Sequence, residues 1–269
     1  MNGKKILFVS SELVPYLPEN QVSLMSYESP RVVNSNGGQI RIFMPRYGVI
    51  NERRHQLHEV IRLSGMNLVV NDMDMPLIIK VASIPKERIQ VYFIDNDEYF
   101  KRKSTFADSK GKMHEDNDER AIFFAKGVIE TVKKLNWAPD IIHVQGWISL
   151  LMPLYCKKYY ADDPLLANTK IVTSFFDTPF EKSLSKDLVS KMAFDGIDKE
   201  LLNGLSNPNY MALAQSAVEY SDGIIIADND IDPSLKKTIL DSGKPTMSFV
   251  QDRDFEDNYE SFYMNHILS

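Results

Sequence analysis

The sequence predicts an α/β protein built on a doubly wound, Rossmann-like and mostly parallel sheet. Residues 6–10 (Ile-Leu-Phe-Val-Ser) form a run without polar alternation, which is typical of a strand buried on both faces. Further apolar runs alternate with helical patterns along the chain, as βαβ units require. Open sheets of this kind bind ligands at the carboxyl ends of their strands, so we expect a ligand site near residues 10–21.

The first half of the chain predicts a strand, a helix and a second strand. The helix spans residues 23–34 and stops at Asn36-Gly37-Gly38, because glycine adopts the left-handed conformation that ends helices. The second strand covers residues 39–44. Three extended segments follow, of which the last two predict a hairpin or neighbouring strands with antiparallel pairing: 66–70, 77–82 and 89–94.

The second half of the chain alternates helices and strands. A polar surface loop is predicted over residues 104–117, followed by a helix over 118–135 whose apolar residues recur on one face. Strands are then predicted at 141–144, 170–175, 223–227 and 246–250. Helices are predicted between and after them, at 147–160, 209–220, 233–240 and, as an amphipathic tail, 254–268.

The composition argues against several classes of protein. The chain has 31 basic and 37 acidic residues, a formal net charge of -6 and no basic stripe, so no nucleic acid partner is expected. Its one cysteine, Cys156, cannot form an internal disulfide and is expected to be a buried structural thiol. No apolar run reaches the roughly 18 residues that a membrane span needs, and no signal peptide pattern is present. We therefore expect a cytoplasmic protein without a membrane partner.

No cofactor or metal site is predicted. A dinucleotide fingerprint, a phosphate loop and a nucleophile elbow are all absent from the sequence. His55 and His58 have a spacing that suits two metal ligands on a helix, but no third ligand lies nearby in the sequence. Three aspartates within residues 228–232 are similar to the start of a calcium loop, yet capping of a helix by Asp232 explains them better.

Several segments, in the same order along the chain, resemble the amino-terminal domain of bacterial glycogen and starch synthases: residues 4–12, Pro45-Arg46-Tyr47, 91–100, Asp116-Asn117, Glu119-Arg120, 139–143 and Trp147. These two-domain glycosyltransferases of the GT-B type transfer glucose from ADP-glucose to the nonreducing end of an α-1,4-glucan. The resemblance runs from the first strand to residue 239. It implies one amino-terminal domain over residues 1–269, with the tail at 254–268 packing back on it and the second, nucleotide-sugar domain absent.

The chain departs from the family motifs at residues that would carry chemistry. Where the family has Lys-Thr-Gly-Gly-Leu, residues 18–22 are Pro-Glu-Asn-Gln-Val, so a cation is lost and Glu19 would repel a diphosphate. The family's His-x-His-Asp-Trp becomes His143-Val144-Gln145-Gly146-Trp147, in which Gln145 can hydrogen-bond a hydroxyl but cannot titrate. Two later pocket positions also differ, because residues 175–178 stand where the family has Ile-His-Asn-Leu and Ala212 replaces a lysine.

The resemblance and the expected ligand edge give a set of candidate binding side chains, without a catalytic or metal-binding residue. The set is Ser11, Glu12, Glu19, Gln21, Asp116, His143, Gln145, Asp177 and Asn209. Structural roles stay open for three of them, since Ser11 and Glu12 can shape the loop after the first strand and His143 can be a hydrogen-bonded core residue. Arg120 is expected to be a structural ion-pair partner.

Two functions remain open. The first is a regulatory or binding module that has lost self-sufficient glucosyl transfer and binds an α-glucan, a sugar nucleotide or a protein on its open interdomain face. The second is an ADP-glucose glucosyltransferase that is active only with a partner chain or as an oligomer. The absence of a basic side chain from the loop at 18–22 favours the first function.

Overall fold

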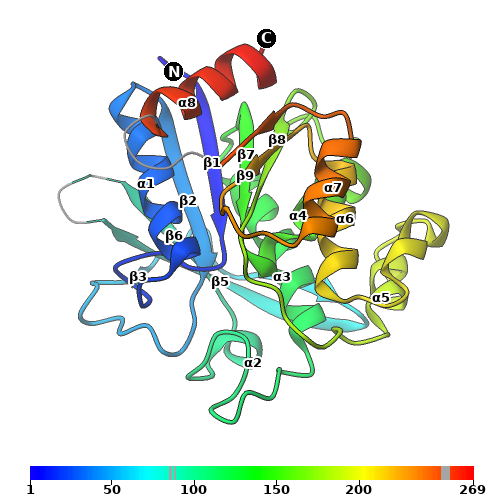
Figure 1. Cartoon of the computed structure of the whole chain (residues 1–269). Coiled ribbons are helices and arrows are strands. Elements are labelled where there is room, and N and C mark those ends of the chain that lie inside the picture. Colours follow the sequence, from blue (N-terminus) through cyan, green and yellow to red (C-terminus); the bar gives the residue numbers. More distant parts are fainter. Residues whose placement is uncertain (85–86, 88, 250–254) are drawn as a thin grey trace.

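The computed structural model describes residues 1–84, 87, 89–249 and 255–269, and its strands form one large sheet (Figure 1). The strands are β1 (Lys5–Ser10), β2 (Gln39–Pro45), β3 (His58–Glu59), β4 (Met66–Val70), β5 (Met73–Ser83), β6 (Gln90–Asp95), β7 (Ile141–Gln145), β8 (Lys170–Phe175), β9 (Gly223–Ile226) and β10 (Thr246–Met247). Their order across the sheet is β10-β9-β8-β7-β1-β2-β6-β5-β3, and β4 pairs with β5.

β1 is the centre of the sheet, and both of its neighbours run parallel to it. Residues 6–10 are fully buried, and Ile6 pairs with Ile40 of β2 on one side and with Ile141 of β7 on the other. From β1 the sheet continues through β2 and β6 in one direction and through β7, β8 and β9 in the other. The predicted doubly wound sheet is therefore confirmed, and its topological switch point lies between β1 and β7.

One end of the sheet is antiparallel, as the segments at 77–82 and 89–94 predict. β5 is 11 residues long and pairs in antiparallel fashion with β6 through residues 78–83. It also pairs with β3 through Lys80 and Val81, and with β4 through residues 73–77. The length of β5 thus lets one strand hold three others.

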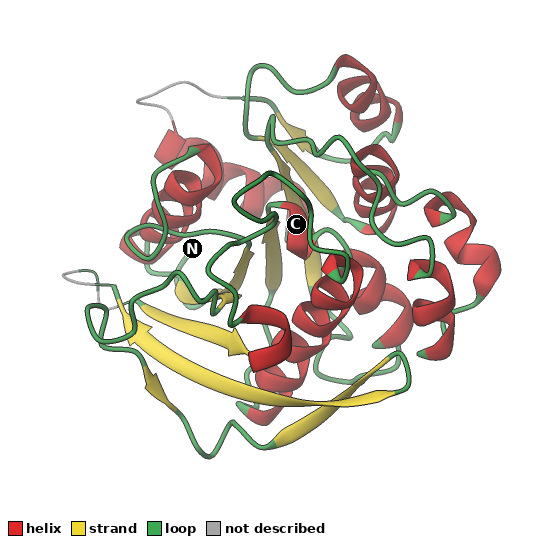
Figure 2. Ribbon diagram, turned by 90° about the horizontal axis from the view of Figure 1, so that it is seen from below, coloured by secondary structure: helices red, strands yellow, loops and turns green. Residues whose placement is uncertain are grey.

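Helical elements cover both faces of the sheet, as Figures 1 and 2 show. They are α1 (Gln21–Ser35), α2 (Asp97–Phe100), α3 (Asn117–Lys134), η1 (Trp147–Ser149), α4 (Met152–Leu154), η2 (Tyr155–Tyr159), α5 (Leu188–Phe194), η3 (Lys199–Leu205), α6 (Tyr210–Tyr220), α7 (Pro233–Asp241), α8 (Phe255–Phe262) and η5 (Tyr263–Ile267). α1 and α8 lie on one face, while α3, α4, α6 and α7 lie on the other (Figure 1). Among the helices of the described ranges, none combines the length and the apolar character that crossing a membrane requires.

α1 begins and ends within two residues of the predicted bounds. Its end is set by Gly37, whose φ of 82° lies in the left-handed region, and by Gly38, whose amide donates to the carbonyl oxygen of Val33 at 2.9 Å. A Cβ on Gly38 would lie 2.6 Å from Cγ1 of Val33, so the turn into β2 requires glycine there.

Several predicted elements differ from the structure. The helix predicted over residues 147–160 is divided into η1, α4 and η2, because Pro153 has no N–H to donate and stands in the first turn of α4. The strand predicted over 246–250 is the two-residue β10, and residue 250 lies outside the described residues. Residues 176–208, for which the sequence predicts no element, contain α5 and η3.

The tail of the chain is helical and packs on the same face as α1. The predicted start of this helix, residue 254, lies outside the described residues. The hydroxyl of Tyr263 lies 2.6 Å from Nδ1 of His143 on β7. Ile267 approaches β9 so closely that a Cβ on Gly223 would lie 2.2 Å from its Cδ1. Close contacts with two central strands therefore hold the tail on the sheet.

Gly223→Ala tests this packing. We expect it to lower the free energy of unfolding by about 1–3 kcal/mol, because the added methyl group must displace Ile267. Thermal unfolding followed by calorimetry would measure the change. Gly204→Ala is the matched control, because no atom lies within 4 Å of a Cβ at that position. It should change the stability by less than about 0.5 kcal/mol. Equal effects of the two substitutions would contradict the close contact between the tail and β9.

Candidate functional site

A buried hydrogen-bond network joins the carboxyl ends of β1 and β7 to α1. The amide of Ser11 donates to the carbonyl oxygen of Gln145 at 2.9 Å, which extends the pairing of the two strands. Ser10 Oγ donates to Oε1 of Gln145 at 3.1 Å and lies 2.5 Å from Oγ of Ser26 on α1. The structure thus brings the candidates Ser11 and Gln145 together. Gln145 is fully buried, and its Nε2 has no partner among the described residues.

Gly146 follows β7 in a conformation that other residues rarely adopt. Its φ is 83°, and a Cβ at this position would lie 1.9 Å from Oγ of Ser11. The resemblance implies an aspartate here, and no such side chain fits unless Ser11 moves. Gly146 and Ser11 therefore depend on each other.

Capping side chains close the first turn of α1. Asn20 Oδ1 accepts a hydrogen bond from the amide of Ser23 at 2.8 Å, and Ser23 Oγ accepts one from the amide of Asn20 at 2.9 Å. Glu12 accepts a hydrogen bond from Nδ2 of Asn20. A helix N-terminus binds anions through free N–H groups and its positive dipole end. Here side chains occupy two of the amides and a carboxylate lies beside them, so the loop is poorly suited to a diphosphate.

The candidates Glu19 and Gln21 lie at the surface beside this cap. Both side chains are exposed. Nε2 of Gln21 donates to the carbonyl oxygen of Ala227 at 3.3 Å, just after β9. This hydrogen bond ties the start of α1 to the carboxyl end of β9, so Gln21 lies at the same carboxyl edge of the sheet as Ser11 and Gln145.

Asp177 and Asn209 are not joined to this network. Asp177 is exposed in the loop after β8, whereas Oδ1 of Asn209 caps α6 by accepting from the amide of Ala212 at 2.9 Å. Ala212, which stands where the family has a lysine, thus donates its amide to this cap. Within the described part of the chain, no group of three or more His, Cys, Asp or Glu side chains is arranged to hold a metal ion.

His143 lies in the core. Its Nε2 is 2.6 Å from Oγ of Ser174, and its Nδ1 is 2.6 Å from the hydroxyl of Tyr263. Its ring packs against Phe8, with ring centroids 5.2 Å apart. Burial lowers the pKa of His143 to about 3, so the ring is neutral at pH 7. Both ring nitrogens are occupied by neighbouring side chains, which matches the core role that the sequence left open.

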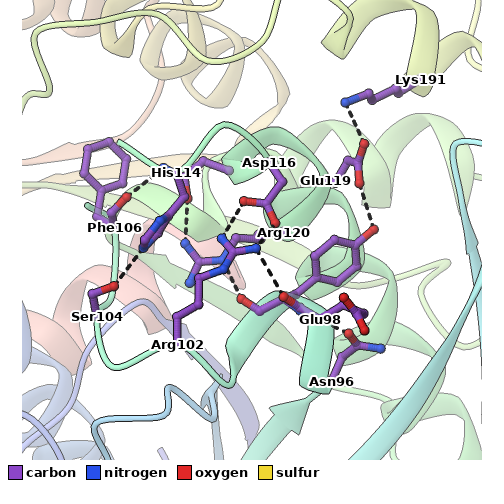
Figure 3. Close-up of polar contacts among 12 residues, drawn as sticks. Asn96, Glu98, Arg102, Ser104, Phe106, His114, Asp116, Glu119, Arg120 and Lys191 are labelled. Carbon is purple, nitrogen blue, oxygen red and sulfur yellow. Dashed lines mark hydrogen bonds and ion pairs between the residues drawn. The ribbon is translucent and has the colours of Figure 1, made fainter. Parts of the chain in front are cut away.

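Arg120 lies at the start of α3, beneath the loop formed by residues 101–116 (Figure 3). Its Nε donates to the carbonyl oxygen of Tyr99 at 2.9 Å, and its Nη1 donates to Oδ1 of Asn117 at 2.6 Å. No carboxylate forms an ion pair with it in the described residues. The prediction that Arg120 is an ion-pair partner is therefore wrong, because a carbonyl and an amide oxygen hold it instead.

Aromatic rings surround Arg120, and several polar atoms among them lack partners. The guanidinium carbon lies 5.6 Å from the ring centroid of Tyr47 and 6.0 Å from that of Trp147. Arg120 Nη2, Tyr47 OH and Trp147 Nε1 are buried and have no hydrogen-bond partner among the described residues. Leaving such an atom unpaired costs about 1–3 kcal/mol. Sequence reasoning assigned no role to Tyr47 and Trp147, and the signal that pointed to them was their place in the family segments.

Asp116 is held by a bidentate ion pair with Arg102 (Figure 3). Nη1 of Arg102 lies 2.6 Å from Oδ1 of Asp116, and its Nη2 bonds the other carboxylate oxygen. Burial alone would raise the pKa of Asp116, but the hydrogen bonds and charge of Arg102 hold it below its ordinary value. Asp116 thus anchors the loop at 101–116 to α3.

A row of aromatic side chains crosses the carboxyl edge from this loop. The ring centroid of Phe106 lies 4.8 Å from that of Trp147 and 5.2 Å from that of Phe180. Phe180 in turn lies 5.6 Å from Tyr210 on α6. Phe106 and Phe180 are partly exposed, whereas Trp147 and Tyr210 are buried. We call these four residues the aromatic row. It joins the loop at 101–116 to the ends of β7 and β8.

Comparison with known proteins agrees with the family resemblance of the sequence. A family model described as the starch synthase catalytic domain matches residues 5–239. The chain belongs to this family. Glycogen synthase of Chlorobaculum parvum is 32% identical over 254 residues, which cover 93% of this chain and 49% of that protein. Glycogen synthase of Chlorobaculum tepidum is 36% identical over 208 residues, covering 74% of this chain and 43% of the relative. The chain thus spans about half the length of these relatives.

A solved structure shares the fold. The catalytic domain of Starch Synthase IV from Arabidopsis thaliana, bound to ADP and acarbose, matches with a TM-score of 0.73 at 16% sequence identity. The match covers 95% of this chain and 53% of that one. The expected fold, an α/β domain of the GT-B glycosyltransferase type, is confirmed.

Gly146→Ala tests the close contact with Ser11. We expect it to destabilise the protein more than Gly196→Ala does. Both glycines have a positive φ, 83° at Gly146 and 88° at Gly196. Of the two, only Gly146 has atoms within 4 Å of the added Cβ, apart from its chain neighbours. The shared backbone strain costs about 1–2 kcal/mol, and overpacking adds about 1–3 kcal/mol at Gly146 alone. Urea unfolding of both variants would measure the difference. A loss at Gly196 as large as that at Gly146 would remove the basis for this contact.

Stability should depend on pH through His143. Its folded pKa of about 3 lies below the unfolded value of about 6.5, so the unfolded chain binds the extra proton and stability falls as pH drops from about 6.5 towards 3. Urea unfolding between pH 7.5 and pH 4.5 would give the slope. His143→Gln should flatten it by up to about 1.4 kcal/mol per pH unit. Tyr263→Phe should lower stability but keep the slope, because the histidine stays buried. Identical slopes for wild type and His143→Gln would contradict the prediction.

Proposed function

We propose that the chain is a binding module of the starch synthase family that holds an α-glucan along the carboxyl edge of its sheet and has no glucosyl transfer of its own. The observation that carries this proposal is the closed first turn of α1. Its capping side chains and Glu12 occupy the loop in which the family resemblance implies a cation and glycine amides for the diphosphate.

The side chain of Gln145 supports the same proposal. It takes the position where the resemblance implies a histidine near the transferred glucose, and it is buried with its Oε1 accepting from Ser10. An amide cannot exchange a proton at neutral pH. Neither a cation for the diphosphate nor a titratable group for transfer is therefore present at these two motif positions.

The aromatic row supports a carbohydrate as the ligand. Partly exposed rings at Phe106 and Phe180 offer flat apolar surfaces. Nε1 of Trp147, which packs on Phe106, and Nη2 of Arg120, which lies by Trp147, have no acceptor among the described residues. A glucan carries apolar ring faces and many hydroxyl oxygens, so it matches both features. The relatives are glycogen synthases, and the Arabidopsis structure holds ADP and acarbose. Of these two kinds of ligand, we assign the carbohydrate and not the nucleotide to this chain.

Ligand binding tests the proposal. We expect maltoheptaose to raise the thermal midpoint, with about 2.7 kcal/mol of stabilisation at a hundredfold excess over the dissociation constant. ADP and ADP-glucose should leave the midpoint unchanged, because the first turn of α1 offers them no cation and the carboxylate of Glu12 lies beside its cap. Transfer of labelled glucose from ADP-glucose to glycogen should be absent.

Matched variants locate the glucan. Phe106→Ala and Phe180→Ala should each weaken maltoheptaose binding about tenfold, which corresponds to about 1.4 kcal/mol. Phe194→Ala is the control, because this phenylalanine is 58% exposed but does not belong to the aromatic row. Stabilisation by ADP-glucose, or measurable glucose transfer, would overturn the proposal in favour of an ADP-glucose glucosyltransferase that works with a partner chain or as an oligomer.

A further inference from the structure

The strand β4 has one edge that is not paired with another strand. It forms a hairpin with β5 in which Val69 stands opposite Asp74, and Nζ of Lys126 on α3 donates to the carbonyl oxygen of Val69 at 2.6 Å. In an antiparallel strand the N–H and C=O of one residue point to the same side. The backbone groups of Val69 therefore face away from β5, and so do those of Asn67, two residues earlier.

The partner of Asn67 on β5 supports this assignment. Asn67 stands opposite Pro76, which has no N–H and cannot take part in a hydrogen-bonded pair through that group. The carbonyl oxygen of Pro76 accepts from Nδ2 of Asn96 instead. In the described ranges, no hydrogen bond reaches the amide of Asn67, the carbonyl oxygen of Asn67 or the amide of Val69.

A groove of about 430 Å³ runs beside this open edge. Residues 66–69 of β4 form one wall, and Tyr159 and Tyr160 at the end of η2 form the other. Lys126 and Glu130 of α3 complete the lining. The groove is therefore bounded on one side by free backbone donors and acceptors and on the other by two aromatic rings.

The charged groups of the groove already have partners. Lys126 pairs with Asp195 at 2.5 Å, and both side chains are only 4% exposed. Glu130 pairs with Lys133 at 3.0 Å. The exposed lining residues are uncharged instead, since Asn67 is exposed, Val69 is 41% exposed and Tyr159 is 39% exposed. A matching ligand is thus uncharged along the stretch that enters the groove.

We propose that this groove docks an extended, uncharged peptide segment of a partner protein, which adds to β4 as a further strand. Outward backbone groups recur every second residue on β4, at a spacing of about 6.6 Å that the backbone of another extended chain repeats. The sequence of β4, Met-Asn-Leu-Val-Val, has no charge or proline of the kind that blunts unpaired edges. Tyr159 and Tyr160, which also line the groove, give such a chain two aromatic rings to pack against.

Amide exchange on the intact protein tests the proposal. The probe is a blocked seven-residue peptide of alternating valine and threonine, and its control carries an N-methyl group on every residue. We expect the first peptide to slow hydrogen exchange at the amides of Asn67 and Val69 at least about tenfold, while Leu68, already paired with β5, changes little. The N-methylated peptide should have no effect, because it cannot donate to the strand edge.

Two substitutions at Val69 distinguish the contribution of its backbone amide to peptide binding from that of its side chain. Val69→Pro removes an amide that makes no hydrogen bond to β5, so peptide affinity should fall at least about tenfold. Val69→Ala keeps the amide and should bind within about threefold of wild type. If Val69→Pro fails to fold, the exchange data and the N-methylated peptide still decide the matter.

Four outcomes would overturn the proposal. The first is absence of peptide binding to wild type, and the second is equal binding of the N-methylated peptide. The third is a concentration-dependent dimer in sedimentation that protects Asn67 and Val69 without peptide, which would make a second copy the occupant. The fourth is protection of the same amides by maltoheptaose, which would make the groove a glucan site.

Discussion

The pairing of β1 with parallel strands on both sides is the constraint on which the rest of the domain depends. A strand buried on both faces can satisfy its backbone only through its two neighbours. At its carboxyl end this requirement continues past the strand, where the amide of Ser11 and the hydroxyl of Ser10 both turn to Gln145. Side chains at the edge where a ligand is expected are therefore held in place by hydrogen bonds that the sheet itself requires. Oε1 of Gln145 is engaged by β1 in this way, whereas its Nε2 has no partner among the described residues.

The departures from the family motifs become a consistent set when they are considered with their neighbours. Gln145 accepts from Ser10, the missing side chain of Gly146 makes room for Ser11, and Asn20 caps α1 while it donates to Glu12. Each change supplies the partner that another residue needs. One buried donor at these positions, Nε2 of Gln145, keeps no hydrogen-bond partner among the described residues, at a cost of about 1–3 kcal/mol. Two further buried donors without a partner in the described ranges, Nη2 of Arg120 and Nε1 of Trp147, lie in or beside the aromatic row.

The predictions from sequence succeeded where a pattern covers a whole element and failed where distant contacts decide. The run at residues 6–10 and the periodicity of α3 each extend through the element they specify. On β7, His143 and Gln145 are two residues apart and must share a face, which alternation alone implies. The contact of the tail helix with His143 could not be predicted, because Tyr263 lies 120 residues from His143. The free edge of β4 also left no sequence signal, since it follows from the strand order.

α3 connects the carboxyl edge with the groove beside β4, and its buried charges define how the two regions relate. Arg120 stands in its first turn and Lys126 about 9 Å further along the axis. The ion pairs of Lys191 with Asp118 and of Lys126 with Asp195 fasten α3 to α5 and the residue that follows it. Removing one partner of a buried pair is costly, so each pair specifies one arrangement of the helix. Coupling between distant sites needs an element with two arrangements. A helix fixed in this way offers only one arrangement. A peptide bound in the groove should therefore leave the affinity of the aromatic row for maltoheptaose unchanged.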